Sequence, residues 1–132
     1  MRTACAVIMV GCLAVTGCDL SETASFNTKH VDDGDADRGH ALVASGAFGC
    51  AACHVIPGVR SPRGNVGPPL DGMASRGLIA GELPNKPGVL VAFLQDPPAL
   101  VPRTGMPDVG LTLEQSRDIA AYLYTLEPGD EP

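Results

Sequence analysis

The clearest hydrophobic pattern lies near the end of the 132-residue chain. Hydrophobic side chains recur there at i, i+3, i+4 and i+7, a spacing that places them on one face of a helix. These positions are Ile119, Tyr122, Leu123 and Leu126. Thr112 and Gln115 precede them with the spacing of a capping box, and Pro128 and Gly129 follow them. The pattern therefore predicts an amphipathic helix that begins after Thr112 and ends at Pro128 and Gly129.

A second helix is predicted in the first half of the chain. Asp35 can cap a helix that runs to about Ser45, with Leu42 and Val43 as hydrophobic side chains. Gly39 lies inside this helix and costs about 1 kcal/mol relative to Ala. A close crossing with the Tyr122 face of the last helix would explain this glycine, and simple tolerance of a Gly is the alternative.

A third helix is predicted to begin at Pro87, since proline is favoured in the first turn of a helix. It would run through Gln95 and stop at Asp96-Pro97-Pro98. Loops rich in Gly and Pro lie between the three helices, among them residues 55–69. The pattern predicts few helices and long loops, which need something further to pack against.

The start of the chain is typical of a secretory signal over residues 1–17. Arg2 is followed by a hydrophobic run from Ala4 to Val15 and then by small residues. The run is short for a membrane anchor and has no basic flank after it. Val15-Thr16-Gly17-Cys18 resembles the lipobox of bacterial lipoproteins, which implies that Cys18 becomes the first mature residue and carries a lipid. An ordinary cleavage site with a spare thiol is the alternative.

The domain organisation follows from this signal. Residues 18–34 start with the lipidated Cys18 and continue as an acidic, aperiodic tether. Residues 35–127 form the domain, and residues 128–132 form a tail. The predicted location is the periplasmic side of the bacterial inner membrane, with the lipid as the membrane attachment, or the periplasm itself if Cys18 carries no lipid.

Composition narrows the possible functions. Aromatic residues make up 4% of the chain, with no Trp, so a core made from this chain alone would be thin. Either a cofactor helps to fill the core or part of the chain lies outside it. The formal net charge of −6 argues against nucleic-acid binding, because no basic patch is available to contact phosphates. No hydrophobic run reaches the roughly 20 residues that span a bilayer.

The cysteines indicate the chemistry. Cys5 and Cys12 fall within the predicted signal, which leaves Cys50 and Cys53 in the sequence Cys50-Ala51-Ala52-Cys53-His54. A thioredoxin-like redox pair requires a βαβ context, and no strand pattern flanks this motif. A zinc site requires a second pair of ligands at suitable spacing, and none follows. The remaining interpretation is the C-x-x-C-H signature of c-type haem attachment.

Several motifs, in order, resemble those of class I cytochromes c. They are Gly39-His40-Ala41-Leu42-Val43, Cys50-Ala51-Ala52-Cys53-His54, Gly67-Pro68-Pro69-Leu70-Asp71-Gly72, Arg76, Met106-Pro107 and Asp118-Ile119-Ala120-Ala121-Tyr122-Leu123. The resemblance implies an all-α cytochrome c fold, with three main helices and long loops around one covalently attached haem c.

The same resemblance implies the roles of individual residues. Cys50 and Cys53 would form the thioethers to the haem, and His54 would be the proximal iron ligand. The carbonyl of Pro68 would accept a hydrogen bond from the other ring nitrogen of His54. Arg76 would lie near the haem propionates. Met106 would be the distal ligand.

The middle of the chain is similar to the haem c domain fused to subunit II of some bacterial terminal oxidases. The similar segments are 81–87 and 93–97, followed by Pro102 and Met106. Phe93 stands where those domains usually carry a Trp near a propionate, and Phe cannot donate a hydrogen bond. The copper-ligand domain of subunit II is absent from this sequence, so an oxidase core subunit is not expected.

The candidates for the distal position are Met106, Met73, His40 and an open site. Met106 lies between Gly105 and Pro107 in a predicted loop, where core filling explains a methionine less well than it does on a helix face. A thioether ligand stabilises the reduced iron and raises the potential. Met106 is therefore the preferred candidate, whereas Met73 is expected to pack on the haem and His40 to face solvent.

These features predict an electron carrier and not an enzyme. The chain shows no Ser/His/Asp set and no paired carboxylates in a Gly-rich pocket. Residues 55–107 carry five basic and three acidic side chains, hence a local charge of +2, which is either a mixed solvated surface or a patch that steers an acidic partner. The expected partner is a respiratory redox complex, such as a terminal oxidase. The alternatives are a haem-based small-ligand sensor or peroxide-reactive cytochrome with a labile sixth ligand, and a haem-bearing assembly subunit.

Overall fold

The computed structural model describes residues 29–60 and 64–130. The predicted signal, Cys18 and most of the tether lie outside the described residues. Within the described part of the chain, no helix combines the length and hydrophobicity needed to cross a membrane.

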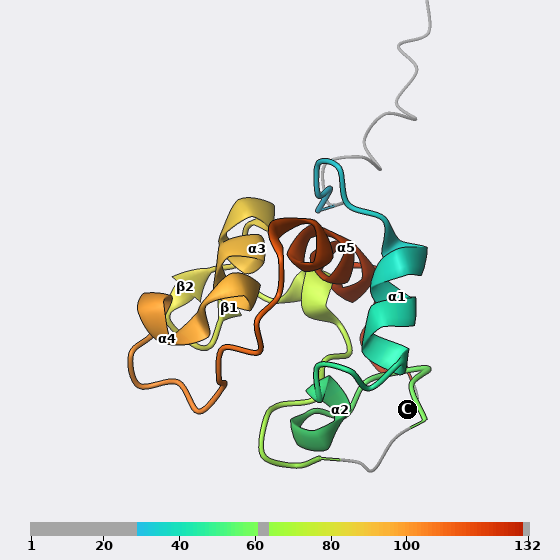
Figure 1. The fold of residues 1–132 in the computed structure, drawn as a ribbon, viewed down its shortest axis with the longest axis horizontal. Helices are drawn as coiled ribbons and strands as arrows, with labels where there is room; N and C mark the ends of the chain where they lie inside the picture. Colours follow the sequence, from blue (N-terminus) through green and yellow to red (C-terminus); the bar gives the residue numbers. More distant parts are fainter. Residues whose placement is uncertain (1–28, 61–63, 131–132) are drawn as a thin grey trace, which may run out of the picture.

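The described residues form a helical domain with little strand (Figure 1). Its elements are α1 (Ala36–Ala44), α2 (Cys50–Cys53), the 3-10 turn η2 (Met73–Ser75), β1 (Leu78–Ile79), β2 (Leu83–Pro84), α3 (Pro87–Gln95), α4 (Pro97–Leu100) and α5 (Leu113–Leu123). The three predicted helices are α1, α3 and α5. The helical turn α2 coincides with the C-x-x-C-H motif, whereas α4, η2 and the strand pair were not predicted.

The beginning of α5 was predicted correctly. The Thr112 hydroxyl accepts a hydrogen bond from the Gln115 N–H at 3.2 Å, and the Gln115 side chain accepts one from the Thr112 N–H at 3.0 Å. This capping box satisfies two N–H groups that the first turn leaves without partners.

The predicted end of α5 was wrong, because the helix stops at Leu123 and not at Pro128 and Gly129. The N–H groups of Thr125 and Leu126 bond to carbonyls three residues back, at 2.9 and 3.4 Å. The chain therefore tightens into turns, and Leu126 is buried from one of these turns. The hydrophobic spacing is the same for a helix and for the turn that follows it, so it does not mark this boundary.

The crossing of α1 and α5 is the most extensive contact between any two elements described. Gly39 is buried where the helices meet. A Cβ atom on Gly39 would clash with the Asp118 carbonyl and would lie 2.9 Å from Tyr122 Cβ. The prediction that Gly39 lies under the Tyr122 face is confirmed.

An ion pair with a buried carboxylate joins the same two helices. The side chain of Asp118 is 4% exposed, and Arg38 reaches it from α1 with Nη2 at 2.7 Å and Nε at 2.8 Å. The carboxylate also accepts the Asp35 N–H at 2.8 Å. The Arg38 hydrogen bonds lower the pKa of Asp118, more than its burial raises it. The start of α1 is thereby attached to α5.

Helix α3 begins at Pro87 and ends at Gln95, as predicted. Asp96 then accepts a hydrogen bond from the Ala99 N–H at 3.0 Å and caps α4. Pro97 and Pro98 thus end one helix and begin the next, since proline fits the first turn of a helix.

The strands β1 and β2 form a small antiparallel hairpin in the register Leu78↔Pro84 and Ile79↔Leu83. Ala80 and Gly81 turn the chain with positive φ angles of 50° and 75°. Two residues per strand are too few for an alternating pattern to be recognised in the sequence. The hairpin delivers the next residue, Asn85, into the buried interior.

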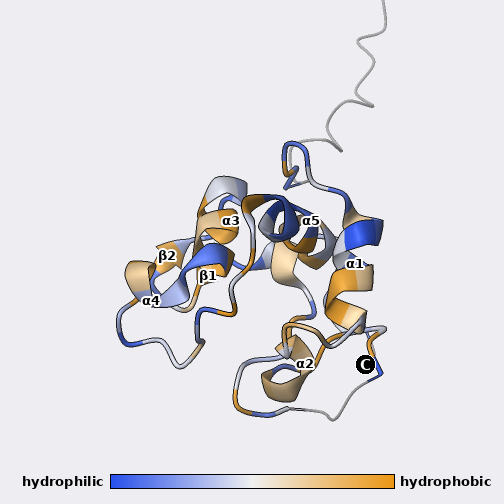
Figure 2. Ribbon diagram, viewed as in Figure 1, coloured by the Kyte–Doolittle hydropathy of each residue, from blue (hydrophilic) through white to orange (hydrophobic). Residues whose placement is uncertain are grey.

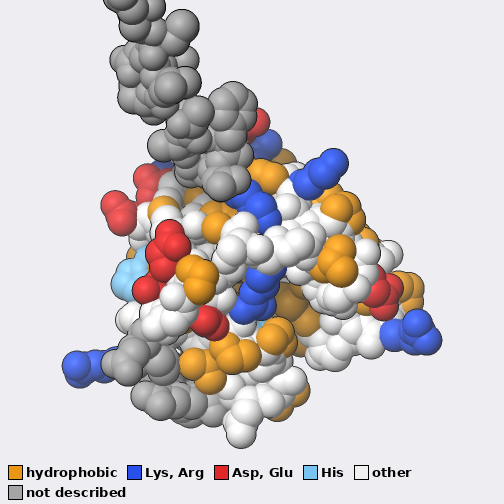
Figure 3. Space-filling view, turned by 180° about the vertical axis from the view of Figure 1, so that it is seen from behind, with side chains coloured by type: hydrophobic (Ala, Val, Ile, Leu, Met, Phe, Trp, Pro, Cys, Tyr) orange, Lys and Arg blue, Asp and Glu red, His pale blue; other side chains and the backbone are white. Residues whose placement is uncertain are grey.

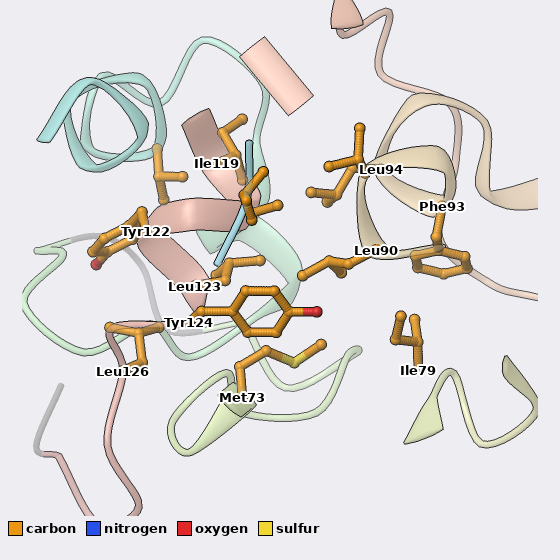
Figure 4. Close-up of a cluster of buried hydrophobic side chains, with 14 of the residues drawn as sticks. Met73, Ile79, Leu90, Phe93, Leu94, Ile119, Tyr122, Leu123, Tyr124 and Leu126 are labelled. Atoms are coloured by element: carbon orange, nitrogen blue, oxygen red, sulfur yellow. The ribbon is translucent and has the colours of Figure 1, made fainter. Parts of the chain in front are cut away.

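The hydrophobic core lies among α1, α3 and α5. Figure 2 shows hydrophobic residues over most of α3 and over the C-terminal half of α1. Figure 4 shows side chains of α3 and α5 facing one another, with Met73 and Tyr124 close by. The labelled members of this cluster are Met73, Ile79, Leu90, Phe93, Leu94, Ile119, Tyr122, Leu123, Tyr124 and Leu126.

Candidate functional site

A cavity of about 720 Å³ opens beside this core. Its walls are mostly hydrophobic, with contributions from α3 and α5 on the core side. The core-side residues are Leu90, Phe93, Leu94, Ile119 and Leu123. Cys50, Cys53, His54 and Met106 also line it. The cavity thus gathers most of the predicted site residues from segments far apart in the sequence.

The His54 ring is held in one orientation by the loop that faces it. Nδ1 lies 2.7 Å from the Pro68 carbonyl oxygen. Since a carbonyl can only accept a hydrogen bond, Nδ1 carries the proton and donates it. The lone pair of Nε2 is then available for a metal. A Cβ on Gly67 would lie 2.6 Å from Nδ1 and 2.9 Å from Nε2, so the ring requires glycine at that position.

The loop that contains Pro68 is attached to α2 by backbone hydrogen bonds. The Gly64 N–H bonds to the Ala51 carbonyl at 3.2 Å, and the Gly67 N–H bonds to the Cys53 carbonyl at 2.8 Å. A Cβ on Gly64 would clash with the backbone of α2. This attachment fixes the loop relative to the His54 ring.

Cys50 and Cys53 stand at the two ends of the single turn of α2. Both thiols are free and half-buried, and both line the cavity. Burial raises the pKa of the Cys50 thiol, so this thiol is neutral near pH 7. Two thiols on one helical turn can react with two groups on the same edge of a flat ligand.

Arg76 also lines the cavity, but its guanidinium is already hydrogen-bonded to the loop after His54. Nη2 donates to the carbonyls of Pro69 and Asp71, the latter at 2.8 Å. The Asp71 carboxylate is 3.9 Å away. Arg76 is therefore bonded to Pro69, which directly follows Pro68, and the Pro68 carbonyl accepts the His54 hydrogen bond.

Two methionines line the cavity, whereas His40 does not. Met106 is half-buried in its loop, where its N–H bonds to the Thr104 hydroxyl at 3.2 Å. Met73 is buried in η2 and belongs to the core cluster. His40 is exposed, with its ring 5.1 Å from that of Tyr122, so the structure excludes it from this cavity.

Phe93 lines the cavity from α3. It is 6% exposed and contributes only hydrophobic contact.

Asn85 and Tyr124 are buried polar residues for which the sequence predicted no role. Asn85 is 6% exposed, and its carboxamide bonds to two backbone carbonyls and to the Tyr124 hydroxyl. Burial raises the pKa of Tyr124 to about 12, so its phenol remains protonated and can donate. One feature of the sequence could have drawn attention to Asn85: it is a polar residue in a pair, Asn85-Lys86, that is flanked by Pro84 and Pro87.

The cavity fits a haem better than a bare metal ion. It is largely apolar and offers one free imidazole nitrogen, thioether sulfurs and two thiols. Among the described residues, no group of three His, Cys, Asp or Glu side chains could hold a metal ion. A porphyrin would supply the missing iron ligands and would fill the apolar space.

Comparisons with known proteins agree with this geometry. The family model described as Cytochrome c matches residues 36–127. The solved structure of cytochrome c2 from Paracoccus denitrificans is similar to the chain, with a TM-score of 0.51 and 23% sequence identity. The match covers 70% of this chain and 95% of that one. A search of curated proteins finds no match. The chain belongs to the cytochrome c family, whose members bind haem c covalently and carry electrons.

Proposed function

We propose that this mono-haem cytochrome transfers single electrons in a respiratory chain at the periplasmic face of a bacterial inner membrane, to which a lipid on Cys18 attaches it. The observation that carries the electron-transfer part is the convergence of His54 and Met106 on one apolar cavity. Two protein ligands would complete the coordination of the iron and leave no position for a substrate.

The haem, when bound, supplies a one-electron iron couple. The chain holds and tunes it. Cys50 and Cys53 would attach the porphyrin edge, and His54 would hold the iron through Nε2, because the Pro68 carbonyl accepts its Nδ1 proton. The hydrophobic walls would exclude water from the iron. Arg76 is proposed to lie beside the haem propionates, which its position in the wall supports.

The ligand assignment is tested by a pair of methionine variants. Met106→Ala should open the sixth position, so that carbon monoxide binds the reduced iron and the reduction potential falls, because a sulfur that stabilises the ferrous state is lost. Met73→Leu is the control. It is close in volume and should cost under about 1.5 kcal/mol of stability while leaving the spectrum unchanged. Absorbance and redox titration measure both.

Two outcomes would contradict this assignment. If Met73→Leu loses the long-wavelength band of sulfur-ligated ferric haem while Met106→Ala keeps it, the two methionines have the opposite roles. If the unmodified reduced protein already binds carbon monoxide, the sixth ligand is labile, which favours a small-ligand sensor or a peroxide-reactive cytochrome.

The proposed membrane attachment rests on the lipobox-like sequence before Cys18. The proposed redox partner is a terminal oxidase, and this proposal rests on the similarity of segments within residues 81–106 to oxidase subunit II haem domains. Cys18→Ser should release the protein from membranes without changing its haem spectrum. Retention of the Cys18→Ser variant on membranes, or a wild type that is already free in periplasmic extract, would refute lipid attachment. Electron exchange of the released form with a membrane oxidase tests the partner separately.

A further inference from the structure

A polar network lies behind the cavity wall and centres on Asn85. Its Nδ2 donates to the Met73 carbonyl at 2.8 Å and to the Arg76 carbonyl at 2.9 Å. These carbonyls stand at the two ends of η2, so one carboxamide spans the whole turn. The Arg76 carbonyl also accepts from Lys29 Nζ at 3.0 Å.

The orientation of the Asn85 carboxamide follows from its partners. Both Nδ2 protons are used by carbonyls, which can only accept, so Oδ1 points to Tyr124. The Tyr124 hydroxyl donates to Oδ1 at 2.8 Å. Asn85 and Tyr124 are both buried, with 6% and 8% of their surface exposed. Removing either partner would leave buried polar groups without hydrogen bonds, which is costly in a dry interior.

The network continues to the loop that orients His54. Arg76 has its backbone carbonyl on Asn85, while its guanidinium donates to the Pro69 and Asp71 carbonyls. Pro69 directly follows Pro68, whose carbonyl accepts the His54 Nδ1 proton. Hydrogen bonds and one short stretch of backbone thus connect the Tyr124 phenol to the proposed iron ligand.

Figure 4 shows the Tyr124 end of the network. The Tyr124 ring lies between the Leu123 and Met73 side chains in this view. Figure 3 shows basic side chains down the middle of the opposite face, with hydrophobic side chains on both sides. Lys29 and Arg76 are in contact through the Arg76 carbonyl, so a lysine on the surface side and an asparagine on the buried side hold the same backbone atom.

We infer that Asn85, fixed by Tyr124, is a positioning residue that sets the hydrogen bond between His54 and Pro68 by holding Arg76 and the loop in place. The inference rests on the proposed role of His54 as an iron ligand. A hydrogen bond from Nδ1 increases the electron donation of an imidazole to its metal. Loosening the bond would favour the ferrous state and raise the reduction potential.

The test uses the holoprotein with Asn85→Leu, which has similar size but no hydrogen bonds, and Tyr124→Phe, which removes a single oxygen. The first readout is proton exchange at His54 Nδ1, divided by exchange of the Ala120 backbone N–H in the α5 core. We expect this ratio to rise at least tenfold in Asn85→Leu and by a smaller factor in Tyr124→Phe. The second readout is the reduction potential, which should rise in both.

Ser116→Ala is the matched control. Its hydroxyl is also buried and donates to the Thr112 carbonyl at 2.9 Å within α5, so it belongs neither to the Asn85 network nor to the loop after His54. It should lower stability by a similar amount and leave both the exchange ratio and the potential unchanged. Should Asn85→Leu not fold, Tyr124→Phe decides the question, because it keeps the size and packing of the residue.

Two outcomes would overturn the inference. Equal acceleration of the His54 and Ala120 protons would mean that the network contributes only general stability. An unchanged ratio and potential in Tyr124→Phe would mean that the His54 hydrogen bond does not depend on Asn85. Failure of the proposed ligand role is distinguishable, since the oxidised unmodified protein would then lack paramagnetically shifted imidazole resonances whatever the variants do.

Discussion

The crossing of α1 and α5 and the wall of the cavity are built in different ways. At the crossing, protein atoms fill the space: Gly39 lies directly against Asp118, and Arg38 neutralises the buried carboxylate. Within the described residues 50–60, 64–70 and 101–111, the cavity wall has one regular element, the single turn of α2. It surrounds about 720 Å³ that no side chain fills.

The difference separates two sources of stability. The crossing is complete with the chain alone, because burial, close packing and a satisfied ion pair are all present there. The cavity wall holds its shape through a few backbone hydrogen bonds and glycines, and its hydrophobic side chains require the haem as a packing partner. The aromatic content of 4% predicted a thin core. Packing atoms are lacking only on the cavity side of the core, whereas the crossing of α1 and α5 is fully packed.

The largest effect should come from removing the attachment of the haem. The double variant Cys50→Ser with Cys53→Ser loses both thioethers, so haem should no longer remain on the denatured chain. We expect the amides of Gly67 and Leu70, which bond to the Cys53 and Val55 carbonyls, to lose protection from hydrogen exchange. The Ala120 amide at the crossing should keep more of its protection. Equal loss at both places would show that the two regions do not differ in this way.

Adding a methyl group at the crossing should have the next largest effect. Gly39→Ala gains helix propensity but forces α1 away from Asp118, so we expect a net loss of about 1–3 kcal/mol of unfolding free energy. Gly88→Ala in α3 is the control. Its Cβ meets nothing within 4 Å, so it should stabilise the protein by up to about 1 kcal/mol. Denaturant unfolding measures both, and stabilisation by both variants would contradict close packing at the crossing.

The smallest effect should be the acid sensitivity of the crossing. Arg38 lowers the pKa of Asp118 in the folded state from about 3.9 in the unfolded chain. The ionised Asp118 carboxylate therefore contributes its full stabilisation above about pH 4. This stabilisation is lost as the pH falls through the pKa that Asp118 has in the folded state. Asp118→Asn should cost about 1–3 kcal/mol at pH 7 and much less at pH 2.

Unfolding of both proteins across this pH range tests the point. Asp32→Asn is the control, because that side chain is 96% exposed and should change stability by less than about 0.5 kcal/mol. A cost of Asp118→Asn that stays constant down to pH 2 would rule out this carboxylate as the source of acid sensitivity.

The features predicted correctly from the sequence are those that depend on neighbouring residues. Thr112 with Gln115, Asp35 before Arg38, and Pro87 in a first turn each act within three or four positions, and each occurs in the structure. The end of α5 was missed because the i, i+3, i+4 spacing continues through the turn that holds Leu126. The hairpin was missed because its strands have two residues each.

The sequence by itself determined the order of the candidate site residues: two thiols and an imidazole within residues 50–54, a proline-rich loop after them and a methionine in a later loop. Only the tertiary structure decided which buried groups meet. Arg38 pairs with Asp118 across 80 residues, and Asn85 meets Tyr124 across 39. Hydrogen bonds within a turn follow from backbone geometry, whereas distant partners meet only where helices cross and bury them, and no local pattern encodes that place.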